Sequence, residues 1–466
     1  MLDTDNPSIL WISPSANGSG DGTFENPFGA IEGALAVVKP GTTIMLKGGV
    51  YRRDATFDIS GTLHQPIRIV AEQGADVEVR NACWFFYDVT DLIVSNLTFR
   101  DAPSGAVSVI GACSRNRFDN LRFIGCGVRA EKSCTFFFGG SGGSCNAVEN
   151  CRFERAPLKP MAAAAIMVSE GNGEGGAPLT NHVFRKNRIV NYDYGILAGT
   201  SDAPAGQFGH IIEYNTLEQC RVEGILVKCG DTVVRGNRVV GCLHRSISIS
   251  AGNGSVVASN RILDCAHGIA VHGNGHSITN NCIVRCGSEA VRVCGPASNI
   301  LVENNTCIDC GTPEGSSGTA RVAGVRIDAG TTSIVRQNLF YGEGKPVAYD
   351  GDPAQPEGKK TLFIKDNAAA GRCKAIDGAV AAKAVFKNGG DGDFTNDSGY
   401  GAGGWVLTPE TFDPQVDEAD IKYCENQGAF EEPDDDEPET DEVAGAAGFD
   451  SFMGKFYPKD ALRDDN

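Results

Sequence analysis

The sequence predicts an all-β fold, a right-handed parallel β-helix in which a long solenoid of stacked coils follows a helical cap at the N-terminus. Three observations predict it: an internal repeat of about 22 residues, 59 glycines that suit a turn at every corner, and a strand–corner–strand pattern in each copy. In such a solenoid each coil packs only on its neighbours, so 466 residues need no domain break.

The repeat is clearest in five segments that align without gaps and carry Asn at the fifth position and Cys at the tenth. They are Ile211–Cys220, Val233–Cys242, Val256–Cys265, Ser277–Cys286 and Leu301–Cys310. Their asparagines, at positions 215, 237, 260, 281 and 305, are 21 to 24 residues apart. Asn tolerates the left-handed conformation of a sharp corner, and its amide can bond to an Asn one coil away. We therefore expect a column of left-handed corner asparagines, with weaker copies at Asn96, Asn120, Asn150, Asn187 and Asn338.

The tenth position of the repeat predicts a second column, of buried cysteines. The chain has 17 cysteines, and none has the pairing expected of a structural zinc site. Free cysteine behaves as a small apolar residue in a protein core. We expect Cys220, Cys242, Cys265, Cys286 and Cys310 to be reduced core thiols, as in a protein made in a reducing compartment.

Four segments are expected along the chain. Residues 1–41 form the entry and cap, with helical spacing in Ala30–Val38; residues 42–345 form the coils; residues 346–430 form an irregular closing segment. Residues 431–466 form an acidic linker and a tail with 13 acidic and 3 basic residues, net −10. The tail tip at 449–457, which carries Phe449, Phe452, Phe456 and Tyr457, is expected to dock on a partner or another subunit of a trimer.

Net charge limits the partners. The chain carries −18, so the part before residue 431 carries −8, which does not favour nucleic acid. An acidic polymer would need a local basic groove. There is no apolar run of 18 residues that would span a membrane, and the first residues lack the pattern of a secretory signal.

One stretch, Leu217–Asn253, carries the residues of a possible active site. It contains Glu223 and, five residues later, Lys228, in the sequence VEGILVKCG. About 300 residues of coils resemble the pectate-lyase-like superfamily, and this stretch resembles the alginate lyase and chondroitinase B family of polysaccharide lyases. That family also has an Arg-His-Gly motif one coil later. Here that place reads Ser250-Ala251-Gly252, and the nearest basic pair is His244-Arg245.

The resemblance implies β-elimination on an acidic polysaccharide. A lyase removes the C5 proton of a uronate, which requires that calcium or an arginine neutralise the neighbouring carboxylate. The resemblance then makes Lys228 the base, Glu223 a calcium ligand, and Arg245 or His244 the group that assists the leaving oxygen. The protein is accordingly expected to be a carbohydrate-active or carbohydrate-binding β-helix.

A second interpretation is a non-catalytic bacteriophage virion or tailspike component. The absence of a secretory signal, the cysteine column and the acidic tether with its apolar tip favour it. A groove lined by Lys228, His244 and Arg245 would favour the carbohydrate-active interpretation, whereas an intersubunit or capsid contact of residues 449–457 would favour the virion interpretation.

Overall fold

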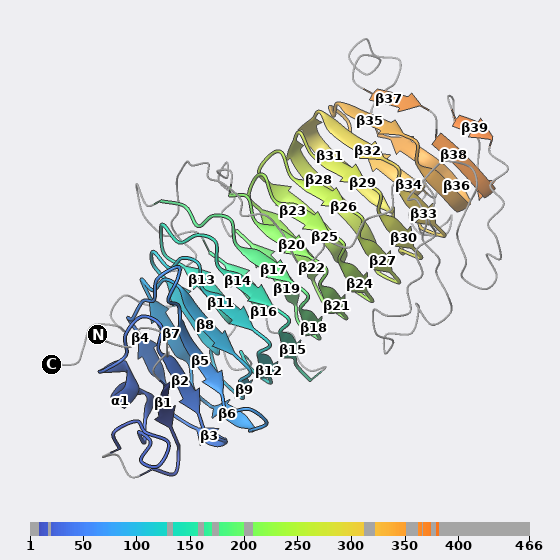
Figure 1. The fold of residues 1–466 in the computed structure, drawn as a ribbon. Coiled ribbons are helices and arrows are strands. Elements are labelled where there is room, and N and C mark those ends of the chain that lie inside the picture. The colour runs from blue at the N-terminus through green and yellow to red at the C-terminus, as the bar shows by residue number, and fades with distance from the viewer. Residues whose placement is uncertain are drawn as a thin grey trace. The chain divides into compact units, whose positions relative to one another are not determined.

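The computed structural model describes ten segments of the chain, which fall into two compact units that meet between Thr216 and Leu217. The described residues are 9–16, 20–127, 134–156, 163–169, 177–199, 208–311, 322–350, 362–365, 367–373 and 379–381. Each unit is built from coils whose strands run parallel to those of the next coil and form three sheets, which we name A, B and C (Figure 1). Among these residues, no helix has the length and apolar character needed to cross a membrane.

The N-terminal unit contains α1 (Ile31–Leu35) and the first strands of each sheet. Its sheet A comprises β1 (Ile9–Ile12), β2 (Thr43–Leu46), β5 (Ile67–Ala71), β8 (Leu92–Ser95), β11 (Arg117–Asp119), β14 (Ala147–Glu149), β17 (Val183–Arg185) and β20 (Ile211–Glu213). Its sheet B comprises β3 (Gly49–Tyr51), β6 (Val77–Arg80), β9 (Thr98–Arg100), β12 (Arg122–Ile124), β15 (Arg152–Glu154) and β18 (Arg188–Val190). Its sheet C comprises β4 (Ala55–Phe57), β7 (Trp84–Tyr87), β10 (Val107–Ile110), β13 (Cys134–Gly139), β16 (Ala164–Val168) and β19 (Tyr194–Ala198).

The C-terminal unit repeats the same three sheets. Its sheet A comprises β23 (Val233–Arg235), β26 (Val256–Ala258), β29 (Ser277–Thr279), β32 (Ile300–Glu303), β35 (Ser333–Arg336) and β37 (Leu362–Lys365). Its sheet B comprises β21 (Thr216–Glu218, which begins at the boundary), β24 (Arg238–Val240), β27 (Arg261–Leu263), β30 (Cys282–Val284), β33 (Thr306–Ile308), β38 (Asn367–Cys373) and β39 (Ala379–Ala381). Its sheet C comprises β22 (Glu223–Lys228), β25 (Arg245–Ala251), β28 (His267–Asn274), β31 (Val291–Ser298) and β34 (Val322–Ile327). The long strand β36 (Leu339–Tyr349) pairs in both sheet B and sheet C.

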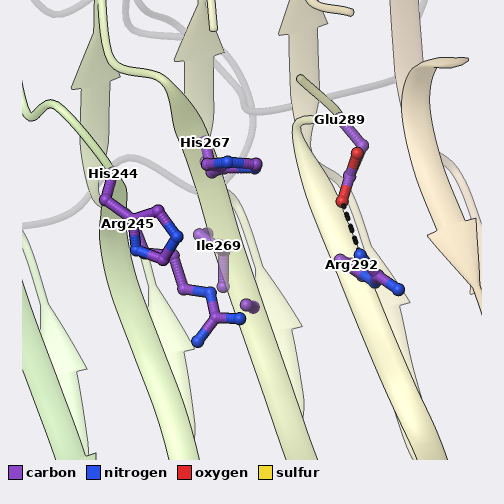
Figure 2. Close-up of a pocket in the computed structure, with 8 residues that line it drawn as sticks. His244, Arg245, His267, Ile269, Glu289 and Arg292 are labelled. Atoms are coloured by element: carbon purple, nitrogen blue, oxygen red, sulfur yellow. Dashed lines mark ion pairs between the residues drawn. The ribbon is translucent and has the colours of Figure 1, made fainter. Parts of the chain in front are cut away.

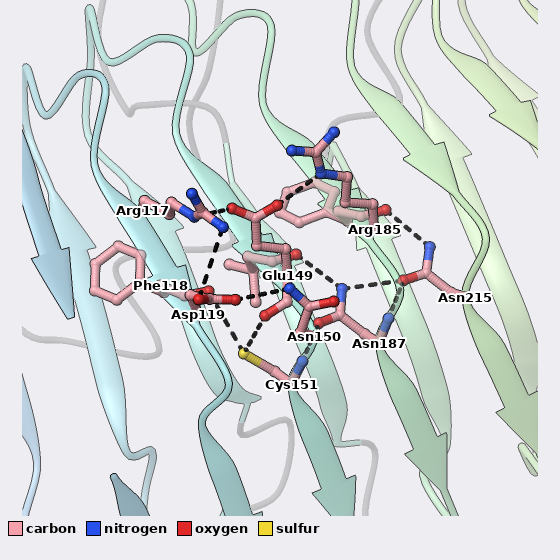
Figure 3. Close-up of polar contacts among 11 residues, drawn as sticks. Arg117, Phe118, Asp119, Glu149, Asn150, Cys151, Arg185, Asn187 and Asn215 are labelled. Atoms are coloured by element: carbon pink, nitrogen blue, oxygen red, sulfur yellow. Dashed lines mark hydrogen bonds and ion pairs between the residues drawn. The ribbon is translucent and has the colours of Figure 1, made fainter. Parts of the chain in front are cut away.

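The predicted asparagine column is confirmed within each unit. In the C-terminal unit, the backbone N–H and the side-chain amide of Asn237 both donate to Oδ1 of Asn260, at 2.9 and 3.0 Å. The same pair of bonds links Asn260 to Asn281 and Asn281 to Asn305. In the N-terminal unit Asn187 bonds to Asn215 in the same way (Figure 3). Each of these side chains satisfies a backbone group that the corner would otherwise leave buried and unpaired.

The left-handed conformation was predicted for these asparagines, and this prediction is wrong by one residue. The left-handed residue is the one before the column, for example Ser259 with φ 56° and Asn280 with φ 56°. The column asparagine itself must point inward to bond along the stack, so the sharp turn falls on its exposed neighbour. Asn96, Asn120 and Asn150 are such neighbours, since they have positive φ and lie outside the column.

A second polar column, which the sequence analysis missed, lies where each coil enters sheet A. In the N-terminal unit it runs through Asn116, Asn146, His182 and His210, each accepting a bond from the backbone N–H of the one before. In the C-terminal unit Thr232, Ser255 and His276 hold the equivalent places. The acceptor is Oδ1 in asparagine and Nδ1 in histidine, so the residue type varies while the bond is kept.

The cysteine column is buried as predicted. Cys220, Cys242, Cys265, Cys286 and Cys310 are each at most 3% exposed. Sγ of Cys265 accepts the backbone N–H of Cys242 at 3.3 Å, so the thiols also serve the stack as acceptors.

The structure corrects the prediction of an N-terminal helical cap. The expected helix at 30–38 is reduced to the five residues of α1, of which Ile31 and Ala34 are buried. Beyond it the chain continues as a turn, in which the backbone N–H groups of Val37 and Val38 bond to the carbonyl oxygen of Ala34, and Val37 is 52% exposed. The acidic linker and the tail tip at 449–457 lie outside the described residues, and most of the closing segment does too.

Candidate active site on sheet C

The candidate site lies on the outer face of sheet C in the C-terminal unit, where β22 and β25 run side by side. Glu223 is opposite Arg245 in the register, and Arg245 is opposite His267. Interior residues of the same strands, Ile225 and Ile247, are fully buried. The outward side chains of adjacent coils therefore form rows across the strands, about 4.8 Å apart.

The alternation of side chains along β22 is interrupted between Glu223 and Lys228. On a regular strand Glu223 and Lys228 would face opposite sides, because their numbers differ by five. A side chain at Gly224 would point inward, 2.9 Å from Cγ1 of Val239, and Ile225 also points inward. Two consecutive inward positions interrupt the alternation, and the register of β22 against β25 shifts between Val227 and Lys228. Lys228 lies opposite Ala251, and its positive charge is one of those that act on the Glu223 carboxyl.

Glu223 forms an ion pair with Arg245, in which Nη1 lies 3.4 Å from Oε1. The Glu223 side chain is 7% exposed, whereas that of Arg245 is 33% exposed and can also face a ligand. Burial raises the pKa of Glu223, and the charges of Arg245 and Lys228 partly offset this. Glu223 and Arg245 thus form a charged cluster, and the charge of Lys228 also acts on it.

A small pocket lies next to this cluster, with His244, Arg245, His267, Glu289 and Arg292 in its wall (Figure 2). The rings of His244 and His267 meet edge to face, with their centroids 5.1 Å apart. Burial is the main cause that lowers the pKa of both rings, and the positive charge of Arg245 adds to it. Both imidazoles are consequently neutral over a wider pH range than a free histidine.

The acidic groups of the pocket are held by Arg292. Nη1 of Arg292 is 3.8 Å from Glu289, and Nη2 is 3.3 Å from Asp328. The pocket has about 40 Å³ of room, far below the roughly 300–1,000 Å³ of typical ligand pockets. The pocket is therefore too small to enclose a ligand of that size.

The structure brings Glu223, His244 and Arg245 close together, whereas Lys228 lies opposite Ala251, at the other end of β22. Glu223, Lys228 and Arg245 lie on adjacent strands, and His244 precedes β25 in the pocket wall. The sequence analysis missed His267, Glu289 and Arg292. Counting from Arg245, His267 and Glu289 follow at intervals of 22 residues, so the repeat length was the signal that would have found them.

The donor set does not fit the calcium ion expected at Glu223. Calcium takes six to eight oxygen ligands. Glu223 is paired with Arg245, and the nearest acidic residue of the pocket wall, Glu289, is paired with Arg292. Among the residues that the structure describes, no group of three or more His, Cys, Asp or Glu side chains is arranged to hold a metal.

Comparison with known proteins supports the same class of fold. The family described as right handed beta helix region matches residues 171–357. The structural neighbours are PL6 alginate lyases. The PL6 family alginate lyase AlyGC is 18% identical with a TM-score of 0.65, covering 88% of this chain and 59% of that one. A PL6 alginate lyase in complex with a trisaccharide is 16% identical with a TM-score of 0.57, covering 86% of this chain and 93% of that one.

One stretch of sequence also matches a curated protein. Over 70 residues it is 40% identical to pectate lyase L of Thermoclostridium stercorarium, covering 14% of this chain and 6% of that protein. The chain thus spans a small fraction of this relative and about three fifths of AlyGC. The protein is a parallel β-helix similar to polysaccharide lyases at low identity, and the likeness establishes the fold alone.

Proposed function

We propose that the protein acts on an acidic polysaccharide by β-elimination at the outer face of sheet C. The observation that carries the proposal is the ion pair of Glu223 with Arg245 on adjacent strands, next to the pocket that His244 lines, with Lys228 on the same strand as Glu223. Proton abstraction next to a carboxylate requires a general base and a cation that neutralises the carboxylate. The names of the neighbouring structures, which are alginate lyases, are consistent with a uronate substrate.

In the proposed reaction the guanidinium of Arg245 binds and neutralises the uronate carboxylate, which makes the C5 proton more acidic. Nζ of Lys228 accepts that proton, the C5–H electron pair forms the C4–C5 double bond, and the C4–O bond breaks. The leaving oxygen accepts a hydrogen bond from His244 and takes its proton from water. Glu223 holds Arg245 in place through their ion pair, so Glu223 is a positioning residue here. Arginine supplies the neutralisation, and no step needs calcium.

The test is an assay of the full chain on alginate, polygalacturonate, chondroitin and dermatan, following the absorbance of the unsaturated product. We expect Lys228→Ala to lower turnover by at least about a hundredfold, the usual contribution of a general base. Lys39→Ala, at an exposed lysine in the N-terminal unit, is the matched control and should keep full activity. Absence of unsaturated product from every polyuronide would rule the proposal out.

The virion or tailspike interpretation stays a prediction, since it depends on residues 449–457, outside the described part of the chain. Deleting residues 443–466 should then weaken assembly while leaving the fold intact. Sedimentation of the full and shortened chains measures this, and identical oligomeric states would count against docking by the tail.

A further inference from the structure

Three arginines form a row on the outer face of sheet B in the N-terminal unit, a different sheet from that of the candidate active site. Arg122 of β12 is opposite Arg152 of β15, which is opposite Arg188 of β18. Arg122 and Arg152 are exposed and Arg188 is partly exposed. We call these three residues the arginine row; their backbones are about 4.8 Å apart from strand to strand.

The arginine row has little counter-charge. Like charges directly opposite one another on adjacent strands destabilise a sheet. Only Arg188 has an acid nearby, with Nη1 3.8 Å from Oε1 of Glu154. In the part of the chain that the structure describes, Arg122 and Arg152 have no ion-pair partner. The positive charges of Arg122 and Arg152 thus lie opposite each other with no ion-pair partner among the described residues.

In sheet A of the same unit, a carboxylate balances the positive charges of two neighbouring arginines. There Glu149 is opposite Arg185 and diagonal to Arg117, and it forms an ion pair with each (Figure 3). The Glu149 side chain is 3% exposed, so both guanidinium groups share one nearly buried carboxylate. In the arginine row of sheet B, Arg188 pairs with Glu154, but Arg122 and Arg152 have no such carboxylate among the described residues.

The surroundings of the row suit a sugar polymer. In the neighbouring outward row, Ile124 and Val190 are half-buried aliphatic side chains on either side of Glu154. Beneath the strands Phe123 stacks on Phe153, with ring centroids 4.6 Å apart, which keeps the arginine-bearing strands rigid. Exposed guanidinium groups next to the aliphatic side chains of Ile124 and Val190 match a chain that has carboxylates on one edge and apolar ring faces.

We propose that the arginine row binds a linear polyuronide that runs across the strands of sheet B, with its carboxylates paired to Arg122 and Arg152. Guanidinium groups bind carboxylates through two parallel hydrogen bonds. The strand spacing is similar to the length of one sugar residue, so successive coils meet successive carboxylates. The adjacent Ile124 and Val190 are aliphatic, whereas single-stranded nucleic acid is normally held by aromatic stacking. This binding site would retain the polymer independently of any reaction at Lys228.

The experiment measures binding, so it can fail separately from the lyase assay. Affinity electrophoresis of the full chain carrying Lys228→Ala, in gels containing alginate or polygalacturonate, should show retardation that salt weakens. Adding Arg122→Ala with Arg152→Ala should weaken binding roughly tenfold or more, and the corresponding Lys pair should retain part of it, since lysine keeps the charge without the planar fork. Dextran and single-stranded DNA are the comparison polymers.

The matched control removes two exposed arginines outside the row, Arg52→Ala with Arg53→Ala, which changes the net charge by the same amount. It should bind within about twofold of the parent, as expected for rim charges outside a site. Equal weakening by both double variants would overturn the proposal, and so would the absence of retardation by any polyuronide. Tighter binding of single-stranded DNA than of polyuronide would assign the row to nucleic acid instead.

Discussion

Nδ1 of His210 accepts a hydrogen bond at 3.2 Å from the backbone N–H of His182. Both rings are fully buried and stacked, with centroids 5.2 Å apart. Because Nδ1 is the acceptor, the neutral ring carries its proton on Nε2, and neither Nε2 atom has a hydrogen-bond partner in the described structure. A second proton on either ring would be a buried, uncompensated charge.

This pair predicts that acid destabilises the protein. Burial lowers the pKa of His210 from 6.5 to about 4, and that of His182 falls well below its usual value. The unfolded chain therefore binds the proton more tightly than the folded one, so stability is present above pH 6.5 and is lost as the pH falls toward 4. The loss from His210 alone is about 3 kcal/mol.

The measurement is the free energy of unfolding from urea titrations at several pH values. His210→Asn keeps an acceptor, as Asn146 does in the same column, and should flatten the profile between pH 6.5 and 4. The control, His64→Asn, changes an exposed histidine and should leave the profile unchanged. An unaltered profile in His210→Asn would show that other groups cause the acid loss.

A second prediction concerns the asparagine column. Asn260 accepts two bonds from Asn237 and donates to Val234 and Asn281. Asn260→Ala leaves buried groups unpaired on both sides, so we expect a loss of about 3 kcal/mol or more in unfolding free energy. Asn253→Ala, on an exposed turn, should cost less than about 1 kcal/mol. Similar losses for both variants would contradict a special role for the column.

A third prediction concerns Gly224. A Cβ atom there would lie 2.5 Å from the carbonyl oxygen of Ser246 and 2.9 Å from Val239. Gly224→Ala should destabilise the protein by about 1–3 kcal/mol through overpacking and should disturb the placing of Lys228. At Gly287 the closest atom to an added Cβ would be 3.4 Å away, so Gly287→Ala should be nearly neutral. Thermal melts compare the two, and equal melting temperatures would refute the steric account.

A fourth prediction concerns thiol reactivity. Hydrogen bonding to neighbouring thiols of the column, together with burial, raises the pKa of Cys242, Cys265 and Cys286 well above its usual value, and a thiol reacts as the thiolate. These thiols should stay unlabelled in the native protein and react after unfolding. Cys145 is exposed and should label at once. Mass spectrometry of labelled peptides identifies each site, and rapid native labelling of a column thiol would disprove its burial.

The period of the sequence was enough to predict the solenoid, the asparagine column and the buried cysteines. A repeated residue in a solenoid meets its own copy one coil away, so sequence spacing becomes spatial contact. The same spacing, counted from Arg245, would also have predicted that His267 and Glu289 lie on the next two coils beside it.

Other features depended on the backbone between repeats. The sequence could not show that the left-handed turn falls on Ser259 rather than Asn260, because both are polar and either can occupy a corner. The second polar column was not predicted because asparagine, histidine, threonine and serine replace one another there. These residues share only the position of a hydrogen-bond acceptor atom.

The sequence by itself determined the fold class through its repeat, and its resemblance to the alginate lyase and chondroitinase B family brought Glu223, Lys228, His244 and Arg245 forward as candidates. Only the tertiary structure decided that Glu223 pairs with Arg245, and that Arg117 and Arg185 share Glu149 whereas Arg122 and Arg152 have no ion-pair partner among the described residues. Spacing specifies which residues lie on neighbouring coils. The inward turn at Gly224 and the reach of each side chain across the coils specify which charges meet, and these arise from packing in three dimensions.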